Sequence, residues 1–195
     1  MHWLILLLAY AVGSIPTGYI VVWITRRINI QTVGSGNIGS TNVGRVAGRR
    51  AALFTQAVDV LKGVIPTVIA IMWNRSHPTP YLVEGAALLT ILGHDFTPYL
   101  RFRGGKGVNT TLGAFIPMFP FAAVLAFVTH FVVRKTLRVV SVASFVAGVA
   151  FVLAAWLIYG WNSRTWTLVL AWAVMMWQHR SNIARLLQGV EPREQ

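Results

Sequence analysis

The stretch Ala51–Trp73, "AALFTQAVDVLKGVIPTVIAIMW", decides the fold class because it is one long, almost uninterrupted apolar segment. It exceeds the roughly 20 residues that a helix needs to cross the hydrocarbon core of a bilayer. Its two charged side chains, Asp59 and Lys62, are three residues apart and therefore share one helix face. An acid and a base placed like this inside a membrane neutralise each other, so we expect an ion pair within a spanning helix.

The composition of the whole chain agrees with this interpretation. Of 195 residues, 55% are hydrophobic and only 11% are charged, against about a quarter in soluble domains. There is no cysteine, which excludes disulfides and thiolate metal sites. The net charge of +12 is explained more simply by cytoplasmic loops and anionic lipid than by nucleic acid.

Further apolar segments follow the same pattern along the chain. They fall near residues 3–25, 51–73, 81–100, 108–119, 120–133, 141–160 and 165–179. Met1–Thr25 has no basic n-region and its apolar run continues past Pro16, so we expect a retained spanning helix rather than a signal peptide. The fourth and fifth segments are short, with Pro117 and Pro120 at the turn between them, and form either two thin spans or a re-entrant hairpin.

The basic residues are distributed very unevenly between the two sides that these segments define. One side receives fourteen: Arg26, Arg27, Arg45, Arg49, Arg50, Arg101, Arg103, Lys106, Arg134, Lys135, Arg138, Arg180, Arg185 and Arg193. The other side receives only Arg75 and Arg164. The positive-inside rule then places the N-terminus outside and the C-terminus in the cytoplasm. We predict a single all-α integral membrane domain over 1–195 with seven transmembrane helices, two of them short around 108–133; five helices plus a hairpin is the alternative.

Polar clusters fall on the basic side. They are "GSGNIGSTNVGR" (34–45), "GHDFTPYLRFRGGKGVNTT" (93–111), "RVVSVAS" (138–144) and "HRSNIARL" (179–186), whereas the outer loops are short and unremarkable. Four clusters at one membrane face predict one site there. A transporter would instead show broken helices in related halves and a polar path near the midplane, and an inert scaffold would not explain the clustering.

The glycine spacing in the first cluster, Gly34-x-Gly36-x-x-Gly39, resembles a dinucleotide fingerprint, with Asp59 about 20 residues further on. A dinucleotide site needs a strand before these glycines, and a membrane helix stands there instead. The second cluster is not a Walker A loop, because Leu100 and Gly107 occupy positions that require Gly and Ser or Thr. Both nucleotide-binding interpretations therefore fail.

The chemistry of the clusters favours an anionic substrate. Glycine runs let backbone N–H groups point into a concavity that holds anions, and "RFRGGKG" adds Arg101, Arg103 and Lys106 before a helix N-terminus. The first cluster offers neutral donors and acceptors with one guanidinium: Ser35, Asn37, Ser40, Thr41, Asn42 and Arg45. Ser40 or Thr41 has the alternative role of capping a helix from about Asn42.

The ionisable groups limit the reaction class. His179 and Asn182 are three residues apart at the end of the last helix and share a face, where His179 has the chemistry of a general base. His94 beside Asp95 is a weaker candidate, since neighbours in a helix do not face each other. None of the five acids lies in the glycine loops, and the histidines form no metal cluster, so we expect neither metal nor cofactor. Acyl transfer fits such a site better than magnesium-dependent phosphoryl transfer.

With these motifs in hand, the chain resembles the PlsY family, the integral-membrane acyl-phosphate:glycerol-3-phosphate acyltransferases of bacteria. Nearly the whole chain is covered, by "GSGNIGSTNVGR", "GHDFTPYLRFRGGKGVNTTLG", "HRSNIARL" and "DVLKG" (59–63). The resemblance implies transfer of a fatty acyl group from acyl phosphate to the 1-hydroxyl of glycerol 3-phosphate, giving lysophosphatidic acid and phosphate at the cytoplasmic side of the inner membrane. It implies direct transfer without acyl-CoA or acyl carrier protein, assisted by a substrate phosphate. From the sequence itself we expect no nucleic-acid partner, and it requires no protein partner.

The resemblance also implies site residues. The catalytic set is Ser35, Arg45, Lys106, His179 and Asn182. The substrate- and phosphate-binding set is Gly34, Gly36, Asn37, Thr41, Asn42, Arg103, Gly104, Gly105, Gly107 and Ser144. Three positions depart from the family pattern: Arg103 replaces Lys, Asn109 replaces Ala, and Ser181 replaces a Glu beside His179. The last change removes a possible ion pair, so the third motif must be oriented by other means or less firmly.

Overall fold

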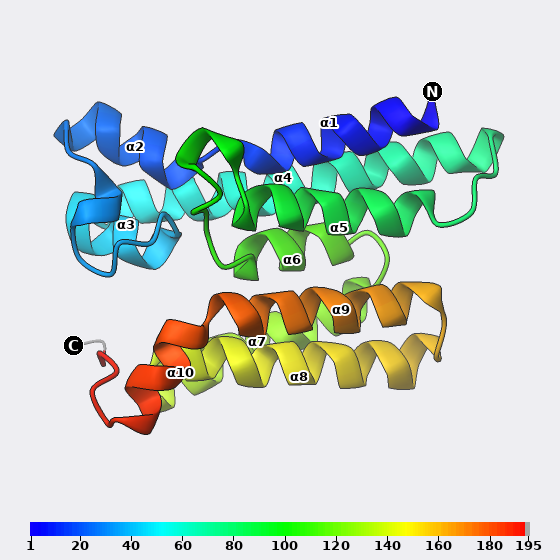
Figure 1. Cartoon of the computed structure of the whole chain (residues 1–195). Helices are drawn as coiled ribbons and strands as arrows, with labels where there is room; N and C mark the ends of the chain where they lie inside the picture. Colours follow the sequence, from blue (N-terminus) through cyan, green and yellow to red (C-terminus); the bar gives the residue numbers. More distant parts are fainter. Residues whose placement is uncertain (194–195) are drawn as a thin grey trace. The chain divides into compact units, whose positions relative to one another are not determined.

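A computed structural model of the chain describes residues 1–193 and, within them, shows helices and no strand (Figure 1). The α-helices are α1 (His2–Ser14), α2 (Thr17–Arg26), α3 (Ser40–Ala47), α4 (Arg49–Ser76), α5 (Leu82–Asp95), α6 (Val108–Phe115), α7 (Pro120–Leu137), α8 (Val140–Tyr159), α9 (Ser163–Gln178) and α10 (Arg180–Leu187). Two 3₁₀ turns, η1 (Ile30–Thr32) and η2 (Pro98–Leu100), lie in the polar loops. The all-α prediction is confirmed.

Several helices are built for lipid. Four helical stretches of the described chain are long and apolar enough to span a membrane: His2–Arg26, Arg49–Ser76, Pro120–Leu137 and Val140–Tyr159. Large apolar side chains lie on their outer faces, for example Leu7 at 64% and Leu157 at 75% exposure. A water-soluble protein does not leave such continuous apolar faces uncovered, so these helices face hydrocarbon.

The first apolar segment is not the single helix that the sequence predicted. It breaks between Ser14 and Thr17 into α1 and α2, and Ile15 has an extended backbone with ψ 114°. The cause is Pro16, which disfavours helical geometry at the residue before it and has no N–H to donate. The break leaves the Ile15 carbonyl outside the helical hydrogen-bond pattern.

The structure divides into two compact units, Met1–Ala114 and Phe115–Gln195. In the first unit, α1 packs on α5 and on α4, and α3 packs on α4 (Figure 1). The α1–α5 crossing is close because both helices place glycine at it. A side chain on Gly13 would strike the Thr90 carbonyl, and one on Gly93 would strike the Tyr10 carbonyl. Small residues at such crossings let helix backbones approach inside a membrane.

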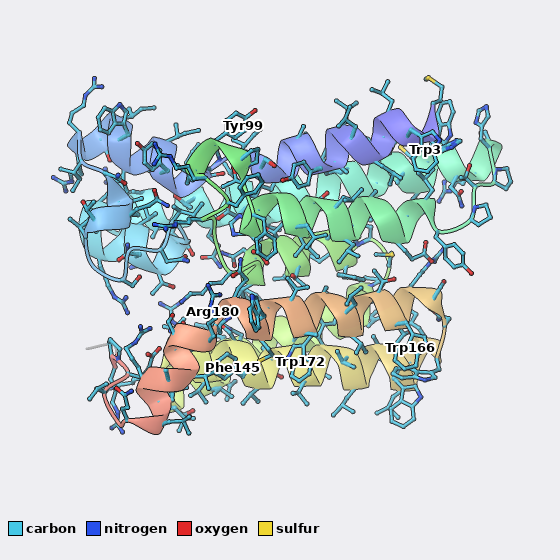
Figure 2. The ribbon with its side chains drawn as sticks, in the orientation of Figure 1. Trp3, Tyr99, Phe145, Trp166, Trp172 and Arg180 are labelled. Carbon is cyan, nitrogen blue, oxygen red and sulfur yellow. The ribbon has the colours of Figure 1, made fainter. Side chains whose placement is uncertain are left out.

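In the second unit, α7 packs on α8, and α8 on α9. Pro120 is the first residue of α7, where a missing N–H costs nothing. The fifth apolar segment is therefore not short, because α7 runs 18 residues to Leu137, and only α6, with eight residues, remains so. Trp156, Trp161 and Trp166 pack around the α8–α9 turn, as aromatic residues do at a membrane interface. Figure 2 shows Trp166 near the start of α9, and Arg180, the first residue of α10, beyond its other end.

Replacing Gly93 with Ala tests the α1–α5 crossing. The added methyl meets the Tyr10 carbonyl, which is backbone and cannot swing aside. We expect a loss of about 1–3 kcal/mol in the free energy of unfolding. The matched control is Gly85→Ala on the same helix, whose methyl meets only the flexible Leu6 side chain. Thermal unfolding in detergent should leave this control unchanged or up to about 1 kcal/mol more stable; equal effects at both positions would contradict the close crossing.

Candidate active-site loops

The first polar loop, 33–39, takes its shape from one buried side chain, that of Asn42 at the start of α3. Asn42 is 2% exposed, and its Oδ1 accepts a hydrogen bond from the Ser35 N–H at 3.0 Å. Its Nδ2 donates to the carbonyls of Val33 at 3.1 Å and Asn37 at 2.9 Å. Since both amide hydrogens and the amide oxygen are used inside the loop, the structure gives Asn42 the task of fixing the loop's conformation.

The other predicted residues of this loop lie on or near its surface. Ser35 and Arg45 are exposed, and Thr41 is half-buried in the first turn of α3. Gly34 and Gly36 both have left-handed backbone, with φ of 60° and 68°. The helix begins at Ser40, with Gly39 as its N-cap and no side-chain cap, so capping by Ser40 or Thr41 is not observed.

The second polar loop, 103–107, folds back onto the end of α5. The N–H of Gly104 donates to the Asp95 carbonyl at 3.1 Å, and that of Gly105 donates to the His94 carbonyl at 3.0 Å. The Gly107 carbonyl accepts from Thr111 at 2.7 Å and starts α6. The loop is thus held to the last turn of α5, whose carbonyls lack helical partners.

These bonds correct one prediction from the sequence. Backbone N–H groups of both glycine loops were expected to converge on an anion, but those of Gly104 and Gly105 bond to α5. In the first loop, Gly36 N–H donates to the Val33 carbonyl at 3.0 Å and Gly39 N–H to Asn37 Oδ1 at 2.8 Å. The reason is that a compact loop satisfies its own backbone donors before it offers any to a ligand.

His94 forms the floor of the second loop. It is buried, and a side chain on Gly105 would strike the imidazole ring at Nε2, so only glycine fits at that position. A methyl on Gly107 would come within 3.1 Å of both carboxylate oxygens of Asp95. Asp95 is fully buried, so a carboxylate does pack beneath this loop although none belongs to the loop itself.

Lys62 connects this floor to the membrane interior. Its Nζ lies 2.9 Å from Asp59 Oδ1, which confirms the predicted ion pair. The same Nζ donates to the Ile15 carbonyl at 3.1 Å and lies 2.7 Å from His94 Nδ1. An ammonium has three hydrogens and no lone pair, so it can only donate and His94 Nδ1 must accept.

Residues that flank the two glycine loops join the first and second motifs within the first unit. Gln31 Nε2 donates to the Arg103 carbonyl at 3.0 Å, and Asn109 Nδ2 donates to Ser40 Oγ at 3.3 Å. The side chain of Arg103 is exposed and that of Lys106 is half-buried. The structure therefore brings the first and second motifs together at one end of this unit, as the sequence predicted for that pair of motifs.

In the second unit, His179 stands at the junction of α9 and α10. The last apolar segment forms α9, which ends at Gln178, and Asn182 lies on the separate short helix α10. His179 and Asn182 therefore do not belong to one continuous helix, contrary to the expectation from the sequence. His179 is 3% exposed, packs edge-on against Phe145, and its Nδ1 lies 2.8 Å from the Met175 carbonyl. A carbonyl only accepts, so Nδ1 carries the proton and Nε2 is the basic nitrogen of the neutral ring.

The serines that open α8 differ in their contacts. Ser144 Oγ donates to the Val140 carbonyl of its own helix at 3.0 Å, while Ser141 Oγ donates to Glu191 Oε1 at 2.8 Å. Asn182 Nδ2 donates to the same oxygen at 2.6 Å. Glu191 therefore links Ser141 to Asn182 of the third motif, while the hydroxyl of Ser144 bonds within its own helix.

Sequence reasoning missed His94, Gln31 and Glu191. The sequence makes His94 a weak candidate because Asp95, its neighbour in the helix, cannot face it, yet the partner of His94 is Lys62 on α4. The available signal was that His94 is a polar residue inside an apolar segment, as Lys62 is. Lys62 already had one partner in Asp59 and could take His94 as a second. Nothing local marks Gln31 or Glu191. Among residues 1–193, no group of three or more His, Asp or Glu side chains is placed to hold a metal ion.

Comparison with known proteins gives consistent matches over the whole length. A sequence profile of the family described as "Glycerol-3-phosphate acyltransferase" matches residues 3–189. The chain is similar to the glycerol-3-phosphate acyltransferase of Clostridium acetobutylicum, with 37% identity over 189 residues that cover 95% of this chain and 96% of the relative. It is 41% identical to the Thermus thermophilus protein of the same name over 192 residues, covering 96% and 92%.

Solved structures agree. The chain is similar to a crystal structure of PlsY, an integral membrane glycerol 3-phosphate acyltransferase, in its glycerol 3-phosphate form. The TM-score is 0.92 at 31% identity, covering all of this chain and 96% of the other. A lysophosphatidic acid form of PlsY gives a TM-score of 0.89 at 30% identity, covering 100% and 95%.

Replacing Lys62 with Met tests its role beneath the loops. Removing the ammonium leaves the buried Asp59 carboxylate without its partner, and we expect a loss of about 3–5 kcal/mol in the free energy of unfolding. Thermal unfolding in detergent measures it, with Arg75→Met, an exposed position on the same helix, as the control. The double variant Asp59→Asn with Lys62→Met should be less destabilised than Lys62→Met alone, because it buries no unpaired charge. A double variant as unstable as the single one would contradict the ion pair's role.

Proposed function

The chain belongs to the glycerol-3-phosphate acyltransferase family, and from that premise we propose that it transfers a fatty acyl group from acyl phosphate to the 1-hydroxyl of glycerol 3-phosphate. The products are 1-acylglycerol 3-phosphate, which is lysophosphatidic acid, and inorganic phosphate. This places the protein at the first acylation step of phospholipid synthesis. The glycerol 3-phosphate and lysophosphatidic acid named for the two similar PlsY structures support the acceptor and the product.

One observation carries the proposal: hydrogen bonds from Gln31 to the Arg103 carbonyl and from Asn109 to Ser40 join the first and second motifs, and both motifs carry basic side chains. Arg45, Arg103 and Lys106 give this end of the first unit three positive charges, and no acidic residue lies within either loop. Guanidinium and ammonium groups are the usual protein ligands of phosphate. Both proposed substrates carry phosphate groups.

The reaction needs positioning more than covalent chemistry. The oxygen of the 1-hydroxyl attacks the carbonyl carbon of the acyl phosphate and forms the ester bond. The bond from that carbon to the phosphate oxygen breaks, and inorganic phosphate leaves. The hydroxyl proton passes to a phosphate oxygen of a substrate or to Nε2 of His179. Donors at the developing oxyanion and correct alignment supply the acceleration.

The proposed catalytic residues are Ser35, Arg45 and Lys106 of the first unit and His179 and Asn182 of the second. The proposed substrate-binding positions are Gly34, Gly36, Asn37, Thr41, Asn42, Arg103, Gly104, Gly105, Gly107 and Ser144. Asn42 and the glycines act by shaping the loops, as their hydrogen bonds and close contacts indicate. No cofactor, metal or protein partner enters this mechanism.

We further propose a single acyltransferase domain with seven membrane-crossing helices. The N-terminus lies outside, and the C-terminus and the reaction lie on the cytoplasmic side of the bacterial inner membrane. The fourteen-to-two distribution of basic residues supports this orientation. The length of α7 supports the count, because its 18 residues are enough to cross a bilayer. The basic residues before α6 and those at the end of α7 belong to the same side in this orientation. If α7 crosses once, α6 with the turn that follows it must make the opposite crossing.

Phosphate release tests the proposed reaction. We expect purified protein in detergent or lipidic mesophase to release phosphate from palmitoyl phosphate only when glycerol 3-phosphate is present, and equally with EDTA. Acyl-CoA and acyl carrier protein should not replace the donor. If the protein transfers no acyl group from any of the three donors, the proposal is wrong, and transport of a phosphorylated solute becomes the next hypothesis to test.

Replacing His179 with Ala tests the site. If Nε2 takes the hydroxyl proton, kcat should fall about 10²–10⁴-fold. A matched control is His77→Ala, an exposed histidine outside the polar clusters, which should keep full activity. An unchanged kcat in His179→Ala assigns the proton to a substrate phosphate.

A labelled serine ester on Ser35 trapped without glycerol 3-phosphate would replace direct transfer by an acyl-enzyme route.

A further inference from the structure

The chain after α10 makes a defined turn that carries a carboxylate back to the third motif. Gly189 has left-handed backbone with φ 72°, and its N–H donates to the Leu186 carbonyl at 3.1 Å. The next N–H, of Val190, donates to the Arg185 carbonyl at 2.9 Å. These two bonds with a left-handed glycine form a Schellman motif, which ends a helix and reverses the chain. Glu191 is therefore directed back along α10.

Glu191 is held by three side chains of the second unit. Its Oε1 accepts from Ser141 Oγ at 2.8 Å and from Asn182 Nδ2 at 2.6 Å. Its Oε2 accepts from Arg185 Nε at 2.7 Å. The Glu191 side chain is 7% exposed, whereas that of Arg185 is 35% exposed. The contacts join the start of α8, the middle of α10 and the tail at one carboxylate.

The carboxylate stays ionised in this setting. Burial by itself would raise the pKa of Glu191, but the hydrogen bonds from Asn182, Ser141 and Arg185, together with the Arg185 charge, lower that pKa below its ordinary value. A group whose pKa is lowered on folding contributes stability above its unfolded pKa and loses it as the pH falls through the folded pKa. The contacts of Glu191 are therefore complete at neutral pH.

An ionised carboxylate fixes which way the Asn182 amide faces. The carboxylate has only acceptors, so the amide must present its NH₂ group to it, and a flip would place two oxygens together. Asn182 is a proposed catalytic residue, and the direction of its amide decides which of its atoms meets a ligand. We propose that Glu191 is a positioning residue that acts through Asn182, holding its amide in the catalytic orientation. This inference rests on the proposed acyltransferase function.

This assignment also accounts for the missing charge at Ser181. The residue before Asn182 carries no charge in this chain, and the carboxylate near the third motif comes from the tail, nine residues beyond Asn182. The alternative is that Glu191 occupies an anion site from which a substrate phosphate must displace it. Near-complete burial and three hydrogen bonds favour a permanent anchor over a displaceable occupant.

A double-variant cycle tests the positioning role. Glu191→Ala should lower kcat for acyl transfer roughly tenfold, the effect of losing one hydrogen bond to a charged group. In an Asn182→Ala background the same change should have no further effect, because the residue through which Glu191 acts is absent. If Asn182→Ala leaves no turnover, the same cycle measured on the affinity for glycerol 3-phosphate decides. Independent, additive losses would overturn the proposal.

Two controls and one further measurement complete the test, and the last one distinguishes a positioning carboxylate from a displaceable anion. Glu84→Gln removes a carboxylate at the start of α5 and, as the control, should leave kcat unchanged. The ratio of wild-type to Glu191→Gln activity should stay constant from about pH 5 to about pH 9, where a glutamate of lowered pKa is always ionised. A Glu191→Ala variant with a lower KM for glycerol 3-phosphate and full kcat would overturn positioning in favour of a displaceable anion. Absence of turnover in the wild type would instead count against the proposed function.

Discussion

The structure of the first unit depends on one ammonium group placed inside an apolar helix. Lys62 Nζ meets a carboxylate, a backbone carbonyl and an imidazole, and each of these groups would be costly to bury alone. The carbonyl of Ile15, where Pro16 breaks the first segment, accepts from Lys62 in addition to the Thr17 N–H at 3.0 Å. Asp59 needs a positive partner, and His94 needs a donor at Nδ1. The Lys62 side chain on α4 thus connects three parts of the unit: the break between α1 and α2, its own helix and the end of α5.

The state of His94 follows from this arrangement. Because the ammonium can only donate, the neutral imidazole carries its proton on Nε2, the nitrogen that lies against Gly105. The second glycine loop therefore rests on a ring that is fixed in position and tautomer from within the membrane. This explains why the loop has glycine there: the space that a side chain would need is filled by a ring that Lys62 does not allow to move.

What the sequence could predict reflects the range of each interaction. The ion pair of Asp59 and Lys62 follows from a spacing of three residues on one helix, and the helical segments follow from apolar runs. The break at Pro16 is also local, but it was overlooked because the apolar run continues through it. His94 with Lys62 and Glu191 with Asn182 depend on how helices pack and on where a tail turns, and no short pattern encodes either. The destination of the loop N–H groups likewise depends on tertiary neighbours.

The internal use of these N–H groups changes how the loops can bind an anion. In a phosphate loop of the nucleotide-binding kind, backbone N–H groups make most of the contacts, and binding depends on backbone geometry. Here the N–H groups of Ser35, Gly36, Gly39, Gly104 and Gly105 hold the loops in shape. In the function that we propose, the attraction for a substrate phosphate then rests chiefly on Arg45, Arg103 and Lys106, with the glycines serving to bring the chain close. Charge-based recognition by exposed arginines is screened by salt, so this site should bind its anionic substrates more weakly as ionic strength rises.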